Sequence, residues 1–146
     1  MSIREDALNR TLNPLLEACA GNEGLTPEAL MEGVARGVIA VPKNIHHDFE
    51  RIMAVGQGVS TKVNANIGSS KDHPEVQNEL QKLCVALKAG ADTVMDLSMG
   101  GNLSEVRREI LRNCPVPLGT VTIYQSIAEV VECQKKEIGE VTVDQI

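Results

Sequence analysis

The sequence has almost no aromatic side chains. Its 146 residues include one Tyr, one Phe and no Trp, whereas proteins that bind single-stranded nucleic acid usually stack the bases on aromatic rings. Concentrated positive charge is missing as well, because 14 basic residues are spread among 20 acidic ones and the net charge is -6. A protein that coats nucleic acid needs the opposite balance. We therefore expect no nucleic-acid partner.

Long apolar runs are also missing. The uninterrupted apolar stretches are only a few residues long, far short of the roughly 20 that span a bilayer. Residues 1–6 lack the apolar centre of a signal peptide. The hydrophobic content of 42% is enough for one ordinary core. These features predict a cytoplasmic protein without membrane contact.

Closely spaced cysteines, as found in metal and cluster sites, do not occur either. The four cysteines are Cys19, Cys84, Cys114 and Cys133, and no two of them form a Cys-x-x-Cys pair. Cys84 falls on the predicted apolar face of a helix, where a cysteine usually packs as a small hydrophobe. None of the four is expected to act as a nucleophile.

The histidines do not suggest a metal site. His46 and His47 are adjacent, and adjacent side chains point in different directions on a helix or a strand. We interpret both as hydrogen-bonding loop residues, with a partner or substrate contact as the alternative. His73 precedes Pro74; we interpret it as a solvated loop residue, with a helix cap or a place near a phosphate as the alternative.

What the sequence does contain is a passage that recurs three times. Residues 61–68, 93–98 and 117–124 each begin as a short β-branched, apolar run and end in a polar or glycine-containing turn. Asn66, Met95 and Tyr124 are equally spaced along the chain, and the interval between them is the length of one βα unit. We predict strands near 61–66, 92–97 and 117–123.

Helices are predicted between these strands. In residues 74–89 the apolar positions Leu80, Leu83, Cys84 and Leu87 have the spacing of one helix face. Pro74 suits the first turn of this helix, and Gly90 the left-handed conformation that ends it.

The second linker has the same design. Its cap candidates are Asn102 and Ser104, and its predicted buried stripe consists of Val106, Ile110 and Leu111. Alternating strands and helices favour a parallel sheet, with the three strands side by side in chain order and both helices on one face.

An amino-terminal region precedes the repeats. Pro14 interrupts the apolar pattern of residues 1–20, so we expect a frayed helix or arm there, followed by a loop over 21–24. Thr26 and Pro27 have the signature of a helix start, and the helix should run to about Ala35, end at Gly37 and lead into a short strand over 38–41. We place a helical amino-terminal region at residues 1–58 and the βα units at 59–146.

In parallel βα folds, ligands bind at the carboxyl ends of the strands. Asn66, Met95 and Tyr124 fall there, and an amide, a soft thioether and an aromatic hydroxyl suit a planar polar ligand. Each of the three could also be an ordinary turn or core residue. Asp96 could transfer a proton, or make an internal hydrogen bond instead. The loops at 68–70 and 98–102 follow strands and could bind an anion, whereas residues 56–58 suggest only a turn.

Three of these passages closely resemble one family. Residues 63–70 (Val-Asn-Ala-Asn-Ile-Gly-Ser-Ser), 90–98 (Gly-Ala-Asp-Thr-Val-Met-Asp-Leu-Ser) and 115–125 (Pro-Val-Pro-Leu-Gly-Thr-Val-Thr-Ile-Tyr-Gln) are similar to motifs of the phosphomethylpyrimidine synthase (ThiC) family of thiamine biosynthesis. Residues 42–47 resemble the upstream loop of the same family. Ser69, Met99 and Thr122 depart from the residues usual there, which are Asn, Thr and Pro.

The resemblance implies a radical S-adenosylmethionine lyase with a (β/α)8 barrel. Its reaction converts 5-aminoimidazole ribonucleotide into 4-amino-5-hydroxymethyl-2-methylpyrimidine phosphate, and its substrate contacts correspond to Asn66, Met95 and Tyr124. It also implies a 4Fe-4S cluster, S-adenosylmethionine and zinc, whose ligand motifs are absent from this chain.

We therefore expect a partial barrel of about three parallel βα units, the amino-terminal third of the enzyme, without synthase activity of its own. The alternatives are a non-catalytic half-barrel derived from this family, which associates with itself or another chain through its exposed sheet edge, and an unrelated α/β module.

Overall fold

The computed structural model describes residues 2–128 apart from 45 and 50, and also residues 130, 131, 135, 137, 139 and 142. Cys133 lies outside these residues. The chain forms two compact units, Met1–Lys62 with Pro115–Pro117 and Val63–Cys114 with Leu118–Ile146. The boundary between residues 58 and 59 stays a prediction. Among the described helices, none has the length and apolar character needed to cross a bilayer.

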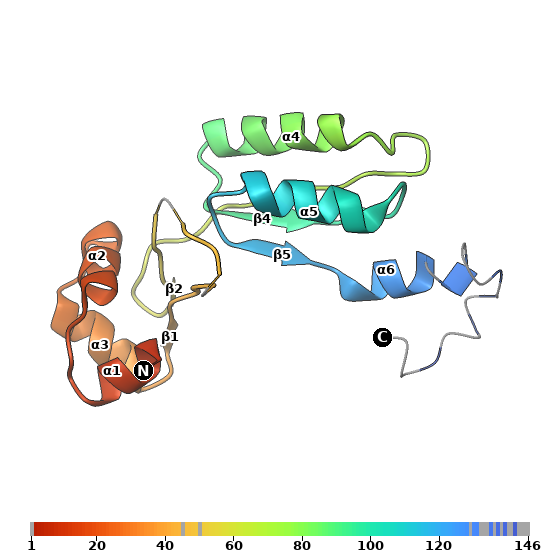
Figure 1. Cartoon of the computed structure of the whole chain (residues 1–146). Coiled ribbons are helices and arrows are strands. Elements are labelled where there is room, and N and C mark those ends of the chain that lie inside the picture. Colours follow the sequence, from red (N-terminus) through yellow and green to blue (C-terminus); the bar gives the residue numbers. More distant parts are fainter. Residues whose placement is uncertain are drawn as a thin grey trace. The chain divides into compact units, whose positions relative to one another are not determined.

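In its described residues the first unit contains three helices and a small sheet (Figure 1). The helices are α1 (Ile3–Leu8), α2 (Pro14–Glu23) and α3 (Pro27–Ala35), and the two antiparallel strands are β1 (Ile39–Ala40) and β2 (Val55–Gly56). Its core consists of buried apolar residues from all three helices, with contributions from β1 and the loop before β2: Ala7, Leu16, Cys19, Ala20, Leu30, Met31, Val34, Ile39 and Ala54.

Capping residues explain where these helices begin. The N–H of Ala29 donates to the Thr26 hydroxyl and Pro27 occupies the first helical turn, so the predicted start and end of α3 are confirmed. The frayed arm predicted over 1–20 is wrong, because Pro14 also begins a helix, with Asn13 as its cap. A proline costs nothing in the first turn, where its missing N–H has no partner to lose. The loop predicted at 21–24 is wrong as well, since α2 continues to Glu23 and ends at Gly24.

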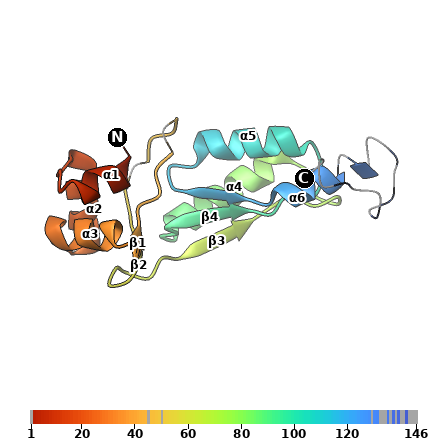
Figure 2. The same ribbon diagram turned by 90° about the horizontal axis from the view of Figure 1, so that it is seen from below.

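The second unit alternates strands and helices. Its elements are β3 (Asn64–Ile67), α4 (Val76–Lys88), β4 (Thr93–Asp96), α5 (Leu103–Asn113), β5 (Leu118–Thr120) and α6 (Thr122–Ala128). In the described residues the strands form a parallel sheet in the order β3-β4-β5, as predicted. Figures 1 and 2 show α4 and α5 side by side on one face of that sheet.

The register of the sheet shows which strand pairs follow the repeat interval predicted from the sequence. Between β3 and β4, Asn64 pairs with Thr93 and Asn66 with Met95, so the interval read from the sequence is also the register of this pair. Between β4 and β5, Met95 pairs with Gly119, which comes earlier in the chain than the interval predicts. The predicted strand over 117–123 is therefore too long, because the strand ends at Thr120 and α6 begins at Thr122.

Three predicted details of the helices are wrong. Cys84 is exposed, because the buried face of α4 is centred on Leu83 and the next residue is rotated by about 100° around the helix. In α5 the buried residues are Leu103, Val106 and Ile110. Leu111, which was predicted to be part of this buried stripe, is 40% exposed. Pro74 lies outside the first turn of α4, since Glu75 is the N-cap. The cap at Asn102 and the left-handed Gly90 agree with the prediction.

Candidate functional site

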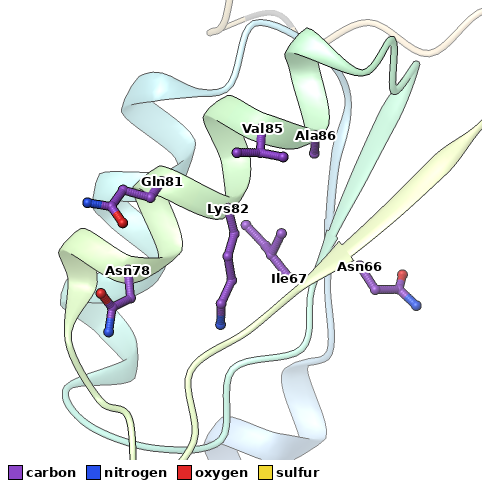
Figure 3. A pocket seen from close by; sticks show the side chains of 7 residues that line it. All are labelled: Asn66, Ile67, Asn78, Gln81, Lys82, Val85 and Ala86. Atoms are coloured by element: carbon purple, nitrogen blue, oxygen red, sulfur yellow. The ribbon is translucent and has the colours of Figure 1, made fainter.

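The face of the sheet that points away from α4 carries a row of residues from all three strands. In a parallel pair, residues in register point to the same side, so Asn64 and Asn66 share a face with Thr93 and Met95, and Met95 with Gly119. The alternate positions Ile67, Val94 and Asp96 are buried. Figure 3 shows Ile67 pointing toward α4 and Asn66 away from it. We call the row Asn64, Asn66, Thr93, Met95 and Gly119 the open face.

Hydrogen bonds connect the polar residues of the open face in one chain. The hydroxyl of Thr93 donates to Oδ1 of Asn64 over 2.8 Å. The Nδ2 group of Asn64 donates in turn to Oδ1 of Asn66 over 2.9 Å. Among the described residues, the Nδ2 group of Asn66 has no partner, and its side chain is exposed. The chain of bonds thus ends in an amide whose N–H groups are available to a ligand.

Met95 lies across the neighbouring strand because Gly119 leaves room for it. A Cβ atom at Gly119 would come within 2.8 Å of Cε and 2.9 Å of Sδ of Met95. The thioether therefore occupies the space that a side chain on β5 would fill. The result is a half-buried apolar surface in register with Asn66.

The loops that follow β3 and β4 are bound tightly to each other. The N–H of Ser69 donates to Oγ of Ser98 over 3.0 Å, and Oγ of Ser69 donates to the carbonyl of Gly100 over 2.7 Å. The N–H of Met99 donates to the carbonyl of Ser69 over 2.9 Å. The N–H groups of Ser69 and Met99, which belong to the predicted anion-binding loops, are thus already used within the protein.

A buried carboxylate holds the first of these loops. Oε2 of Glu79 accepts from the N–H of Gly68 over 2.7 Å, and Oε1 accepts from Nζ of Lys82 over 2.6 Å. Nζ of Lys82 also donates to the carbonyl of Gly68 over 3.2 Å. Because Gly68 closely follows Asn66, this pair fixes the chain just beyond the open face.

Asp96 makes the internal hydrogen bonds that were one of its two predicted roles. Its Oδ1 accepts from the N–H of Ser98 over 3.0 Å and from the Ser98 hydroxyl over 2.5 Å. Its Oδ2 lies 4.0 Å from Nε of Arg107. The carboxylate is buried under the sheet, on the side opposite to the open face. This position gives it a structural role in the loop after β4.

Tyr124 does not lie at the level of Asn66 and Met95. It belongs to the first turn of α6, where its N–H donates to the carbonyl of Val121 over 3.2 Å and its side chain is half-buried. The equal spacing predicted that Tyr124 would project at the level of Asn66 and Met95, and this was wrong because β5 ends at Thr120 and Gly119 is the partner of Met95. The next residue, Gln125, accepts from Arg107 and donates to the Ser104 hydroxyl over 3.2 Å, which ties α6 to α5.

A cavity lies beside the open face, between α4 and the edge strand β3 (Figure 3). Its volume is about 520 Å³. The lining residues come from these two elements: Asn66, Ile67, Asn78, Gln81, Lys82, Val85 and Ala86. Of the three predicted site residues only Asn66 is among them. Lys82 is committed to Glu79 and Gly68, so we place the candidate site on the open face instead.

Metal ligands were not predicted in this chain. Within the described residues, no group of three or more His, Cys, Asp and Glu side chains could hold a metal ion.

Burial, and then the nearby Glu23 carboxylate, raises the pKa of the Cys19 thiol to about 11, so this group is not a thiolate at neutral pH. His46 donates its backbone N–H to the Asn44 side chain, and the rings of His47 and Phe49 meet edge to face at 5.7 Å.

Sequence reasoning missed the bonds that support the site. It treats Thr93 and Asn64 only as strand residues, and Glu79 only as an acidic residue that complements the positive end of the helix dipole. The sequence interval between Asn64 and Thr93 is the same as that between Asn66 and Met95. Applying the repeat to the alternate residue of the strand could therefore have found this pair.

Comparison with known proteins agrees with the resemblance of the sequence motifs. A model of the Radical SAM ThiC family matches residues 2–146. The phosphomethylpyrimidine synthase of Desulfotalea psychrophila is 58% identical over 146 residues, which cover 100% of this chain and 33% of the relative. The phosphomethylpyrimidine synthase of Thermoanaerobacter sp. is 48% identical over 129 residues, which cover 88% of this chain and 30% of the relative. The one from Pyrococcus abyssi is 44% identical over 144 residues, which cover 99% of this chain and 33% of the relative.

The chain spans about a third of the length of the curated relatives it matches. The similarity extends over both compact units, since the alignment with the first of these relatives covers the whole chain. The chain belongs to the radical SAM ThiC family.

Proposed function

We propose that this chain forms part of the wall that binds 5-aminoimidazole ribonucleotide in a phosphomethylpyrimidine synthase. In that enzyme the ribonucleotide would be converted into 4-amino-5-hydroxymethyl-2-methylpyrimidine phosphate. The observation that supports the proposal is the family match over residues 2–146, combined with the pairing of Asn66 and Met95 on one open face.

The chemistry of these side chains suits the ribonucleotide. The ligand combines a flat heterocycle with hydroxyl and phosphate oxygens. Asn66 offers N–H groups to its acceptor atoms, and Met95 offers an apolar surface to the flat ring. Tyr124 is the third proposed contact, from the first turn of α6. The role of these residues is to bind and orient the substrate.

Radical chemistry would come from groups outside the described residues. The family name implies S-adenosylmethionine and an iron-sulfur cluster, which would supply the radical that starts the rearrangement. The cysteines that the structure describes do not fit such a cluster, since Cys19 and Cys114 are buried and Cys84 lies alone on the outside of α4. We assign no catalytic step to this chain. Zinc is implied only by the resemblance.

The sheet itself suggests how the chain would continue into a larger fold. β3 and β5 each have one strand neighbour in the described residues, and we propose that both edges continue into a (β/α)8 barrel in the longer protein. A second candidate function is a non-catalytic half-barrel that associates through the β3 edge. Exposed apolar residues near this edge favour it, since Val63 is 59% exposed and Val85, on α4, is 66% exposed.

Substitution of Asn66 tests the proposed function. Asn66→Ala removes the N–H donors of the open face and is expected to weaken binding of 5-aminoimidazole ribonucleotide to the chain about tenfold, the effect of one or two hydrogen bonds. The dissociation constant is measured by titration calorimetry at high ligand concentration, since one wall of a site binds weakly.

Asn113→Ala is the matched control. Asn113 is also exposed, and its side chain donates to the carbonyl of Glu109 within α5. Its replacement should leave the dissociation constant unchanged. Equal constants for Asn66→Ala and the unmodified chain, or no binding at all, would count against the ribonucleotide site and in favour of the half-barrel.

A further inference from the structure

We propose that Thr93 and Asn64 are positioning residues that set the hydrogen-bonding polarity of Asn66. Through them Asn66 presents N–H donors, and not its carbonyl oxygen, to the ligand. The atom it binds would then be an acceptor, such as a phosphate oxygen or an unprotonated ring nitrogen. This inference rests on the proposed function only in taking Asn66 as a ligand contact.

The geometry of the three side chains supports a directional relay. Thr93 stands directly opposite Asn64 in the register of β3 and β4, and Asn66 follows Asn64 on the same face. The two bonds, 2.8 Å from the Thr93 hydroxyl to Oδ1 of Asn64 and 2.9 Å from Nδ2 of Asn64 to Oδ1 of Asn66, have ordinary lengths. The three polar groups are therefore linked along the open face in the order Thr93, Asn64, Asn66.

The direction follows from the two hydrogen bonds as they stand in the structure. A Thr hydroxyl has one proton, which Thr93 gives to the carbonyl oxygen of Asn64. Asn64 then donates from its NH2 group to Asn66, and the carbonyl oxygen of Asn66 is the acceptor. The part of the Asn66 amide left for a ligand is its own NH2 group.

The neighbourhood makes this polarity selective. The half-buried thioether of Met95 is in register with Asn66 and offers no strong donor or acceptor. A ligand acceptor placed beside Asn66 would be paired, while a ligand donor in the same place would face another donor and stay unpaired. A mismatch of this kind costs more than a missing contact, because a desolvated polar group is left without a partner.

Two substitutions of Thr93 separate the relay from a packing role. Thr93→Val keeps the β-branched shape and removes the hydroxyl. Thr93→Ser keeps the hydroxyl and removes the branch. If Thr93 only supports the strand, Val should be tolerated and Ser should not. If it directs the relay, Ser should behave like Thr and Val should not.

The first measurement uses the whole chain without ligand. Side-chain amide signals of Asn64 and Asn66 are compared by nuclear magnetic resonance. We expect slow solvent exchange and a downfield shift for the Asn64 NH2 group, and solvent-like exchange for that of Asn66. Thr93→Val should speed the exchange at Asn64, and Thr93→Ser should not. The reverse pattern at Asn64 and Asn66, or equal behaviour of the two variants, would overturn the relay.

The second measurement adds 5-aminoimidazole ribonucleotide. Thr93→Val should weaken its binding roughly fivefold and Thr93→Ser less than about twofold, since one ordinary hydrogen bond is lost in the first and kept in the second. If the ribonucleotide binds equally to both variants, the inference fails and the proposed function stands. If it binds to no form of the chain, the proposed function fails, and the exchange data alone decide whether the relay exists.

Discussion

Replacing Glu23 by Ala is expected to lower the free energy of unfolding of the first unit by about 3–5 kcal/mol, the usual cost of removing one partner from a buried ion pair. The Glu23 side chain has no exposed surface and its partner Lys62 has 8%. The N–H groups of Ala54 and Ser60 donate to the carboxylate over 3.0 and 3.2 Å, the Ser60 hydroxyl over 2.9 Å and Nζ of Lys62 over 2.8 Å. Without Glu23, these donors and a buried ammonium group lose their acceptor.

Urea denaturation of the whole chain provides the measurement, followed through the methyl signals of Met31 and Met53, which are buried in the same unit. Glu32→Ala is the control. Its salt bridge with Arg36, at 3.6 Å, joins two exposed side chains one helical turn apart, and its loss should cost less than about 0.5 kcal/mol. Similar losses in the free energy of unfolding for both variants would show that the buried ion pair contributes no more to stability than the exposed one.

The same carboxylate should make the first unit sensitive to acid. Burial alone would raise the pKa of Glu23, but the hydrogen bonds from Ala54, Lys62 and Ser60 outweigh it and lower this pKa from 4.5 to about 2. A lowered pKa stabilises the folded form fully above about pH 4.5, and the contribution is lost as the pH falls toward 2. The loss is on the order of 3 kcal/mol, and it should be absent from the Glu23→Ala variant.

Replacing Gly100 by Ala is expected to destabilise the second unit by about 3 kcal/mol, at the upper end of the cost of overpacking. A Cβ atom there would lie 2.2 Å from the carbonyl carbon of Ser70 and 2.5 Å from the backbone nitrogen of Lys71. Both are backbone atoms that no rotamer change can move. The loops after β3 and β4 would separate, and the bond from Ser69 Oγ to the Gly100 carbonyl would break.

Methyl signals of Met95 and Met99 report on this unit during urea denaturation. Gly21→Ala is the control, because a Cβ atom at this position in α2 meets nothing within 4 Å. It should leave these signals unchanged and stabilise the first unit by about 0.5–1 kcal/mol, as expected for Ala instead of Gly inside a helix. An unchanged unfolding midpoint for Gly100→Ala would mean that the two loops are not in contact.

The sequence predicted the parallel sheet because its signal is local and repeated. The repeat interval matches the register of Asn66 with Met95. It failed at Tyr124 because the connection between β4 and β5 has a different length, so that Gly119 is the partner of Met95. A β-branched run such as 120–123 favours a strand by propensity, yet α6 begins at Thr122, and side-chain bonds of Gln125 tie this helix to α5.

Buried polar residues were the hardest to predict. Glu23 was placed in a loop and Glu79 was expected only to complement the positive end of the helix dipole, whereas the side chains of both are buried carboxylates with several donors. A charged residue is normally assigned to the surface, and its donors come from loops that are distant in sequence. The repeat interval and the motif resemblance both identified Asn66 and Met95 as site candidates, but the hydrogen bonds that link Thr93, Asn64 and Asn66 became visible only in the structure.

The central claim is that the open face binds the ribonucleotide, and the methionine methyl groups test it most directly. With labelled methyl groups, intermolecular nuclear Overhauser effects from 5-aminoimidazole ribonucleotide are expected at Met95. None are expected at Met99, although its side chain is more accessible, at 54% exposed. Effects at Met99 without any at Met95, or no effects at any methionine, would contradict the claim.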